Sequence, residues 1–123
     1  MSDYIFITGT NTNVGKTYFG LSLLKYLLPD KKCFAFKPIE TGCKVSNSKL
    51  IPADSSKYYK LLDSAHSLEQ INPYRFVQPV SPYLAIKKAK KRIFLKNYYN
   101  KLKSITKGNS TILIEGAAVS YTN

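Results

Sequence analysis

The amino-acid sequence predicts an α/β protein with an open parallel sheet and flanking helices. Two observations lead to this fold class. A glycine-bounded loop at residues 9–15 directly follows the apolar run at residues 4–8. Further along, short apolar runs rich in β-forming residues alternate with segments of helical periodicity, as in parallel sheets. Since the chain has 123 residues, a single domain over residues 1–123 is expected.

The first predicted strand covers residues 4–8, and we expect it at the centre of the sheet because it is apolar on both faces. A helix follows from about Lys16, with a broad apolar face, and ends at Pro29. Residues 33–36 form the second predicted strand, which Pro38 closes because proline cannot continue a central ladder. This half of the chain is therefore predicted to be a parallel β-α-β unit.

The second half of the chain contains predicted helices and one further strand. Residues 41–52 are rich in Gly, Ser and Asn and are predicted to be an exposed loop, and a helix opens at Asp54. Three prolines make residues 71–82 largely non-helical. Two helices are expected next, one from about Tyr83 and one that carries Leu95, Tyr98, Leu102 and Ile105, followed by a turn at residues 107–109 and a third buried strand at residues 111–114.

The loop between the first strand and helix has the chemistry of a phosphate site. Its backbone N–H groups can turn inward between Gly9 and Gly15, and the helix N-terminus adds partial positive charge. Lys16 adds a full charge, and the Thr17 hydroxyl is placed to bind a magnesium ion that bridges phosphate oxygens. With five residues between its glycines, the loop is one residue longer than the usual P-loop. We predict a P-loop rather than a chance Gly-Lys-Thr turn.

Two more charged residues stand at strand ends, where ligands bind in open parallel sheets. Lys37 follows the second strand and Glu115 the third. A carboxylate there is typical of the magnesium side of a P-loop site, although a solvated acid is the alternative. Asp54 is either a helix N-cap or a second metal-side carboxylate, and Lys37 by itself is equally consistent with a surface lysine.

The formal charge of +12 raises nucleic acid or an anionic membrane as a partner. However, the lysines are scattered, and the one dense cluster, residues 87–92, fits the solvated face of a helix that buries Leu84, Ala85, Ala89 and Ile93. Neither an aromatic RNA-binding signature nor a helix-turn-helix pattern accompanies it. We therefore predict neither nucleic acid nor membrane as a partner.

The cysteines and the N-terminal residues give information about the cellular compartment of the protein. Cys33 and Cys43 are the only cysteines and His66 the only histidine, so neither a zinc site nor a disulfide framework is predicted. Cys33 is expected to be a buried strand residue. The chain enters a strand without a signal core, and no apolar run approaches the length of a membrane span. A cytoplasmic location is expected.

Together these motifs resemble the N-terminal part of the dethiobiotin synthetase family. The resemblance covers nearly the whole chain, and the long-spaced P-loop and the Lys-Pro-x-x-[Ser/Thr]-Gly segment are typical of that family. The segments that carry it are residues 8–17, 37–42, Asp54, 72–76, Ser81-Pro82 and 115–117. Partitioning and regulatory ATPases share the architecture, but their P-loop has an additional lysine near its start, and no lysine lies between Met1 and Gly15.

The resemblance implies a reaction and a set of site residues. The reaction is MgATP-dependent closure of a ureido ring: 7,8-diaminononanoate and CO2 form a carbamate, which takes the γ-phosphoryl group before the second amine displaces phosphate, giving dethiobiotin, ADP and phosphate. Lys37 and Lys16 are the implied catalytic residues, and Thr41 and Thr12 the substrate contacts. The metal side is Thr17, Asp54 and Glu115, and the ATP-binding set is Asn13, Val14, Gly15, Lys16, Thr17, Tyr18, Asp54, Glu115, Gly116, Ala117 and Ala118.

The sequence also departs from the family pattern. Asn13 stands where many members have glutamate, Tyr83 where histidine is frequent, and Ala118 where a second glycine is common. A Cβ at residue 118 is expected to crowd backbone near a phosphate. Members continue beyond the third strand and form homodimers, so we expect a domain truncated after that strand and incomplete at its C-terminus, with a catalytically impaired remnant as the alternative to an active enzyme.

Overall fold

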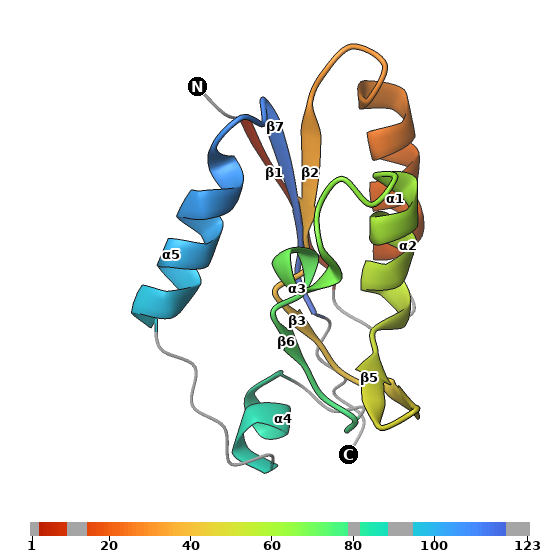
Figure 1. Cartoon of the computed structure of the whole chain (residues 1–123), viewed down its shortest axis with the longest axis vertical. Helices are drawn as coiled ribbons and strands as arrows, with labels where there is room; N and C mark the ends of the chain where they lie inside the picture. The colour runs from red at the N-terminus through yellow and green to blue at the C-terminus, as the bar shows by residue number, and fades with distance from the viewer. Residues whose placement is uncertain (1–2, 10–14, 79–81, 89–94, 118–123) are drawn as a thin grey trace.

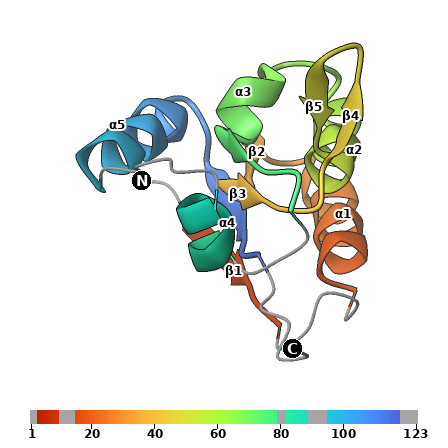
Figure 2. The ribbon, with the colours of Figure 1, turned by 90° about the horizontal axis from the view of Figure 1, so that it is seen from below.

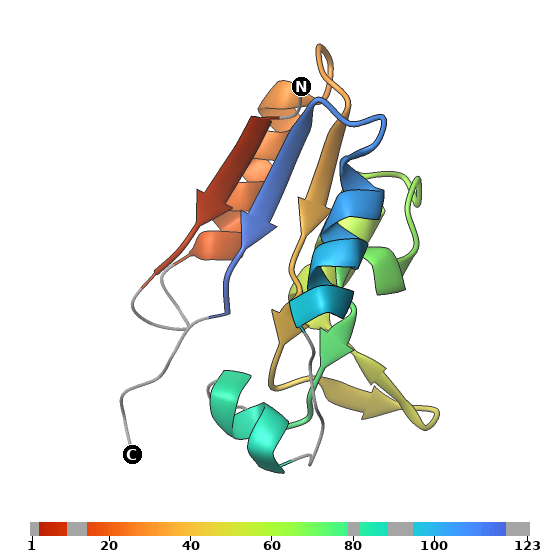
Figure 3. The ribbon, with the colours of Figure 1, turned by 90° about the vertical axis from the view of Figure 1, so that its left-hand side faces the viewer.

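The computed structural model describes residues 3–9, 15–78, 82–88 and 95–117. Its central sheet contains β1 (Asp3–Ile7), β7 (Thr111–Glu115) and β2 (Cys33–Phe36), in the order β1-β7-β2. β7 is parallel to both neighbours, and the three strands lie side by side in Figure 3. The predicted parallel α/β sheet is confirmed, and the strand bounds differ from the predicted ones by at most one residue.

The position of β1 corrects the prediction that it lies at the centre. Within the described residues β1 pairs with β7 alone, and the Phe6 side chain is 68% exposed. Every residue of β2 and β7 is buried. A short apolar run does not tell which strand will pair with it, and β7, from the far end of the chain, inserts between β1 and β2.

Helices cover both faces of the sheet (Figures 1 and 2). α1 (Lys16–Leu27) and α2 (Ala53–Leu61) lie on one face, and α5 (Leu95–Thr106) lies on the other. The core between them is apolar. It includes Leu24, Phe34, Phe36, Tyr58, Leu62, Ile112 and Leu113. Packing both faces with helices is what allows β2 and β7 to bury all of their side chains.

The predicted exposed loop at residues 41–52 is wrong in its central part, because it contains an antiparallel hairpin. β4 (Lys44–Ser46) pairs with β5 (Lys49–Ile51), and both strands are largely exposed. The turn residues Asn47 and Ser48 have φ of 52° and 63°, the left-handed backbone that two-residue hairpin turns require. The sequence lacks the glycine that usually announces such a turn.

Short elements connect the hairpin to the sheet. β3 (Ile39–Glu40) pairs in parallel with β6 (Tyr74–Arg75), and α3 (Leu68–Ile71) begins with a capping box between Ser67 and Gln70. Neither β3, β6 nor α3 was predicted, since each has four residues or fewer. Such lengths are too short for a periodic pattern.

The last predicted helix before α5 is α4 (Pro82–Lys88). It buries Ala85, but Leu84 is 43% exposed, so the expected inward position of Leu84 is wrong. Ala89, Ile93 and the end of the basic cluster lie outside the described residues. Cys33 and Cys43 are both free cysteines and both are buried. The prediction that Cys33 is a buried strand residue is confirmed. No helix in the described part of the chain is long and apolar enough to cross a membrane.

Candidate functional site

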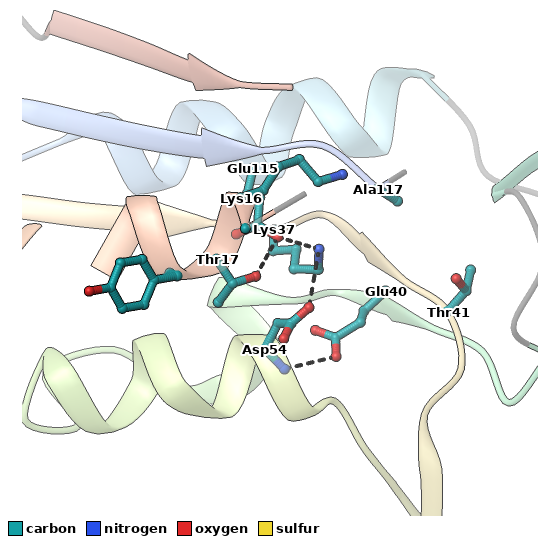
Figure 4. A pocket seen from close by; sticks show the side chains of 10 residues that line it. Lys16, Thr17, Lys37, Glu40, Thr41, Asp54, Glu115 and Ala117 are labelled. Atoms are coloured by element: carbon teal, nitrogen blue, oxygen red, sulfur yellow. Dashed lines mark hydrogen bonds and ion pairs between the residues drawn. The ribbon is translucent and has the colours of Figure 1, made fainter. Parts of the chain in front are cut away.

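A polar cavity of about 450 Å³ lies at the carboxyl ends of β2 and β7, beside the start of α1 (Figure 4). It is lined by Gly15, Lys16, Thr17, Tyr18, Lys37, Glu40, Thr41, Asp54, Glu115 and Ala117. Nine of these ten residues are predicted site residues, and the tenth is Glu40. Segments that are distant in the sequence therefore meet at one cavity, as the rule for ligand positions in open α/β sheets requires.

The start of α1 supplies the phosphate-binding features. Gly15 is the N-cap of α1, with φ of 83°, a conformation that a side chain disfavours. Lys16 follows as the first helical residue and is 8% exposed. Burial lowers the pKa of the Lys16 ammonium, and Lys37 lowers it further, while Glu115 and Asp54 oppose the shift. An anion in the cavity would meet this ammonium and the N–H groups of the helix N-terminus.

Glu115 is the most buried charged group at the cavity, with 1% of its surface exposed. Its Oε2 accepts hydrogen bonds from Lys37 Nζ at 2.6 Å and from Thr17 Oγ1 at 2.9 Å. Its Oε1 accepts one from Tyr58 Oη at 2.6 Å. The alternative of a solvated strand-end acid is therefore wrong. A carboxylate this deeply buried needs such donors, because desolvation without them is costly.

Lys37 is 4% exposed and is not a surface lysine. Its ammonium lies 2.6 Å from Glu115 Oε2 and 3.9 Å from Asp54 Oδ2, and Figure 4 shows it between the two carboxylates. The backbone carbonyl of Lys37 accepts a hydrogen bond from Asn72 Nδ2 at 2.7 Å. Side chain and backbone are thus both fixed at the end of β2.

Asp54 lies in the first turn of α2, but Pro52 is the N-cap, so the N-cap reading of Asp54 is wrong. Glu40 satisfies the start of the helix instead. Its Oε2 accepts from the Asp54 N–H and its Oε1 from the Ser55 N–H, both at 3.0 Å, and Ser55 Oγ donates to Oε1 at 2.7 Å. The Asp54 side chain is thereby left to face Lys37.

The residues present fit a magnesium ion that also binds nucleotide phosphates. Two carboxylates, Glu115 and Asp54, and one hydroxyl, Thr17, face the same cavity, and the Lys37 ammonium already occupies a cation position between the carboxylates. Magnesium usually takes one or two carboxylates together with phosphate oxygens and water. Among the described residues, no group of three or more His, Cys, Asp or Glu side chains is arranged so that it could hold a metal ion by itself.

The structure places the other predicted residues as follows. Thr41, Tyr18 and Ala117 line the cavity. Gly116 is not among the lining residues, and its N–H donates to the Ile7 carbonyl at 3.1 Å, which ties the end of β7 to β1. Thr12, Asn13, Val14 and Ala118 lie outside the described residues, as do Ser81 and most of the P-loop.

Two residues that form hydrogen bonds with the predicted site residues, Glu40 and Tyr58, were not predicted from the sequence. Glu40 caps α2, and only its position three residues after Lys37 indicated that it lies near the site. Tyr58 contacts Glu115 from within a helix whose apolar pattern made it look like an ordinary core residue. Its hydroxyl and the carboxylate are 57 residues apart in sequence, so no local pattern announces the contact.

Comparison with known proteins shows which family the chain belongs to. A family model described as an AAA domain matches residues 3–123. ATP-dependent dethiobiotin synthetase BioD of Aeromonas salmonicida is 32% identical over 114 residues, which are 91% of this chain and 50% of the relative. The same enzyme of Buchnera aphidicola is 32% identical over 117 residues, or 94% and 52% of the two chains. That of Legionella pneumophila is 40% identical over 80 residues, or 65% and 35%.

The chain spans about half the length of the first two of these relatives. The resemblance inferred from the motifs is confirmed, since these relatives carry the name that the motifs predicted. The chain therefore belongs to the AAA domain family, and it is similar over most of its length to ATP-dependent dethiobiotin synthetases.

Proposed function

We propose that this chain carries the MgATP and carbamate part of a dethiobiotin synthetase, which closes a ureido ring on 7,8-diaminononanoate with CO2. The observation that carries the proposal is the gathering of Lys16, Thr17, Lys37, Asp54 and Glu115 at one cavity. The relatives are named ATP-dependent dethiobiotin synthetases, which supports an ATP-dependent reaction of this kind. Every intermediate in it is an anion, which two buried ammonium groups suit.

In this proposal the start of α1 binds the nucleotide phosphates. Gly15, Lys16, Thr17 and Tyr18 supply N–H groups and the ammonium, and Asn13, Val14, Gly116, Ala117 and Ala118 complete the nucleotide set. Thr17, Asp54 and Glu115 hold magnesium, which neutralises phosphate charge when bound. Thr12 and Thr41 contact the diamine.

Lys37 and Lys16 act as the catalytic residues. Their ammonium groups stabilise negative charge where it develops, on the carbamate and on the γ-phosphoryl group in transfer. Lys37 is well placed for this task because its ammonium is buried at the cavity, between the carboxylates of Glu115 and Asp54. The protein's part of the chemistry is therefore positioning and charge stabilisation rather than a covalent intermediate.

The test is incorporation of labelled bicarbonate into an acid-stable product by the chain with MgATP and 7,8-diaminononanoate. Lys37→Ala should abolish the label, and Lys25→Ala, an exposed lysine in the last turn of α1, should leave it unchanged. Absence of label from a folded parent chain would make this length a catalytically impaired remnant. ATP hydrolysis at a rate that does not depend on 7,8-diaminononanoate would favour the alternative that the chain is a partitioning or regulatory ATPase.

We propose further that the protein is a cytoplasmic homodimer in its complete form and binds neither nucleic acid nor membrane. The family resemblance supports the dimer, and the scattered lysines argue against a nucleic-acid surface despite the charge of +12. Analytical ultracentrifugation of the chain tests the dimer. Binding to duplex DNA that weakens steeply with salt would contradict the second part.

A further inference from the structure

Tyr58 is buried in α2, yet its hydroxyl reaches the end of β7. Its relative exposure is 0%, and Oη donates to Glu115 Oε1 at 2.6 Å. In this contact the Tyr58 O–H is the donor and the Glu115 carboxylate is the acceptor.

The two oxygens of Glu115 have different surroundings. Oε2 accepts from Thr17 and Lys37, which both line the cavity. Oε1 accepts from Tyr58, which is not among the described residues that line the cavity. One oxygen therefore faces the groups that a cation and a phosphate would disturb, whereas the other is held from the protein interior.

The Tyr58 hydroxyl occupies the space that a side chain at residue 20 in α1 would fill. A Cβ built at residue 20 would lie 2.1 Å from Tyr58 Oη and 3.1 Å from Cζ. Both separations are too short for an unshifted tyrosine, so any other residue at position 20 would displace the Tyr58 hydroxyl from its present position. The absence of a side chain at residue 20 and the presence of a hydroxyl at residue 58 thus serve the same contact.

We propose that Tyr58 is a positioning residue for Glu115, the carboxylate on the metal side of the site. Its hydrogen bond would keep the Glu115 carboxylate in its present orientation when a magnesium ion takes the place of the Lys37 ammonium at Oε2, and the lack of a side chain at Gly20 leaves room for the Tyr58 hydroxyl. The inference rests on the proposed nucleotide site. A cation held by Glu115 would compete with Lys37 and Thr17 for Oε2, whereas Tyr58 would still donate to Oε1 and fix the carboxylate. Partners behind metal ligands commonly act in this way.

The experiment measures ATP binding by calorimetry to the chain, in EDTA and across a magnesium titration, for the parent, Tyr58→Phe and Tyr59→Phe. Tyr59 lies next along the same helix and packs against the core, so it controls for loss of a phenol. Tyr58→Phe should raise the half-saturating magnesium concentration about tenfold and leave binding in EDTA unchanged. Tyr59→Phe should change neither quantity.

Gly20→Ala should shift the magnesium requirement in the same direction, and the double variant should be no worse than the more affected single one, because both changes break one contact. If Tyr58→Phe does not fold, Gly20→Ala carries the test. An unchanged magnesium requirement in Tyr58→Phe, or an equal loss of binding in EDTA, would overturn the inference. So would a parent that binds ATP without regard to magnesium. Binding that behaves as expected without any dethiobiotin synthesis would refute only the proposed function.

Discussion

Lys37 and Glu115 form a buried ion pair, so each charge is compensated by the other. Both are buried, and their charged atoms lie 2.6 Å apart. Such a pair contributes little net stability, because both ions lose their hydration, but removal of one partner leaves a buried charge without compensation. The pair is therefore sensitive to substitution and well suited to a site where one cation exchanges for another.

Lys37→Met, which keeps the length of the side chain and removes its charge, should lower the free energy of unfolding by on the order of 3 kcal/mol in EDTA. Added magnesium should recover part of this loss, because the freed carboxylates then bind the ion more readily than in the parent. Urea unfolding with and without magnesium measures both effects. Lys25→Met, at an exposed position, serves as control, and equal stability of Lys37→Met and the parent in EDTA would contradict the expectation.

His66 gives a prediction about pH. Its ring packs against Phe34 with the centroids 4.4 Å apart, and burial lowers the pKa of the imidazole from 6.5. The folded state therefore binds the proton less readily than the unfolded state, so stability is complete above pH 6.5 and falls as the pH drops below it. His66→Gln should reduce this loss between pH 7.5 and 5.5 in urea unfolding. An identical pH dependence in both proteins would exclude His66 as the cause.

At the scale of elements, α2 shows how helix and site depend on each other. The helix has no capping side chain at Pro52, and Glu40 on β3 satisfies its first N–H groups instead. A carboxylate at this end also interacts favourably with the helix dipole. The position of Asp54 at the cavity therefore depends on a residue that lies in another element.

Glu40→Ala should destabilise the fold by about 1–3 kcal/mol, because it leaves three donors at the start of α2 without their acceptor. Thermal unfolding followed by circular dichroism measures the change. Glu69→Ala is the matched control, since Glu69 is an exposed glutamate in the first turn of α3. A loss no greater than that of Glu69→Ala would show that the bonds to Glu40 contribute nothing.

The contact between α1 and α2 at Gly20 gives another prediction. In an isolated helix, Gly→Ala stabilises by about 1 kcal/mol. At residue 20 the new Cβ meets Tyr58 and lies 3.2 Å from Ile7 Cδ1, so Gly20→Ala should destabilise by about 1–3 kcal/mol. The penalty should shrink in Tyr58→Phe, which removes the nearest atom. Denaturant unfolding of the parent, the two single variants and the double variant tests this, and a net gain in stability from Gly20→Ala alone would rule out the clash.

At the scale of the whole molecule, the edge of the sheet at β1 is the feature that we expect to govern association between chains. Within the described residues β1 pairs with β7 alone, and Phe6 and Tyr4 are exposed on it. An open edge with apolar side chains favours association with other chains. The net charge of +12 opposes association at low salt, since like charges repel over about 10 Å at 0.1 M ionic strength.

The chain should therefore associate with rising concentration and with rising salt, and Phe6→Lys should reduce that association. Light scattering between low and high ionic strength measures both trends. Tyr26→Lys is the control, because Tyr26 is also aromatic and is more exposed than Phe6 but lies on α1. If both variants reduce association to the same extent, added charge rather than the β1 edge is responsible.

Local patterns were enough to locate most elements of the fold and the groups that meet at the cavity. The apolar runs gave β1, β2 and β7, and the glycine-bounded loop before Lys16 gave the start of α1. Strand ends marked Lys37 and Glu115, because the carboxyl ends of parallel strands gather at one edge. The β4–β5 hairpin and the short elements β3, β6 and α3 were missed, since their residues carry no periodic signal.

The sequence by itself determined the α/β class, the strand ends that bear charge and the family resemblance, because these follow from spacing along the chain. Only the tertiary structure decided that β1 lies at the edge of the sheet within the described part of the chain, that Glu40 caps α2 and that Tyr58 passes Gly20 to reach Glu115. Each of these depends on atoms from segments that are distant in sequence. Packing in three dimensions selects such contacts, and spacing along the chain does not encode them.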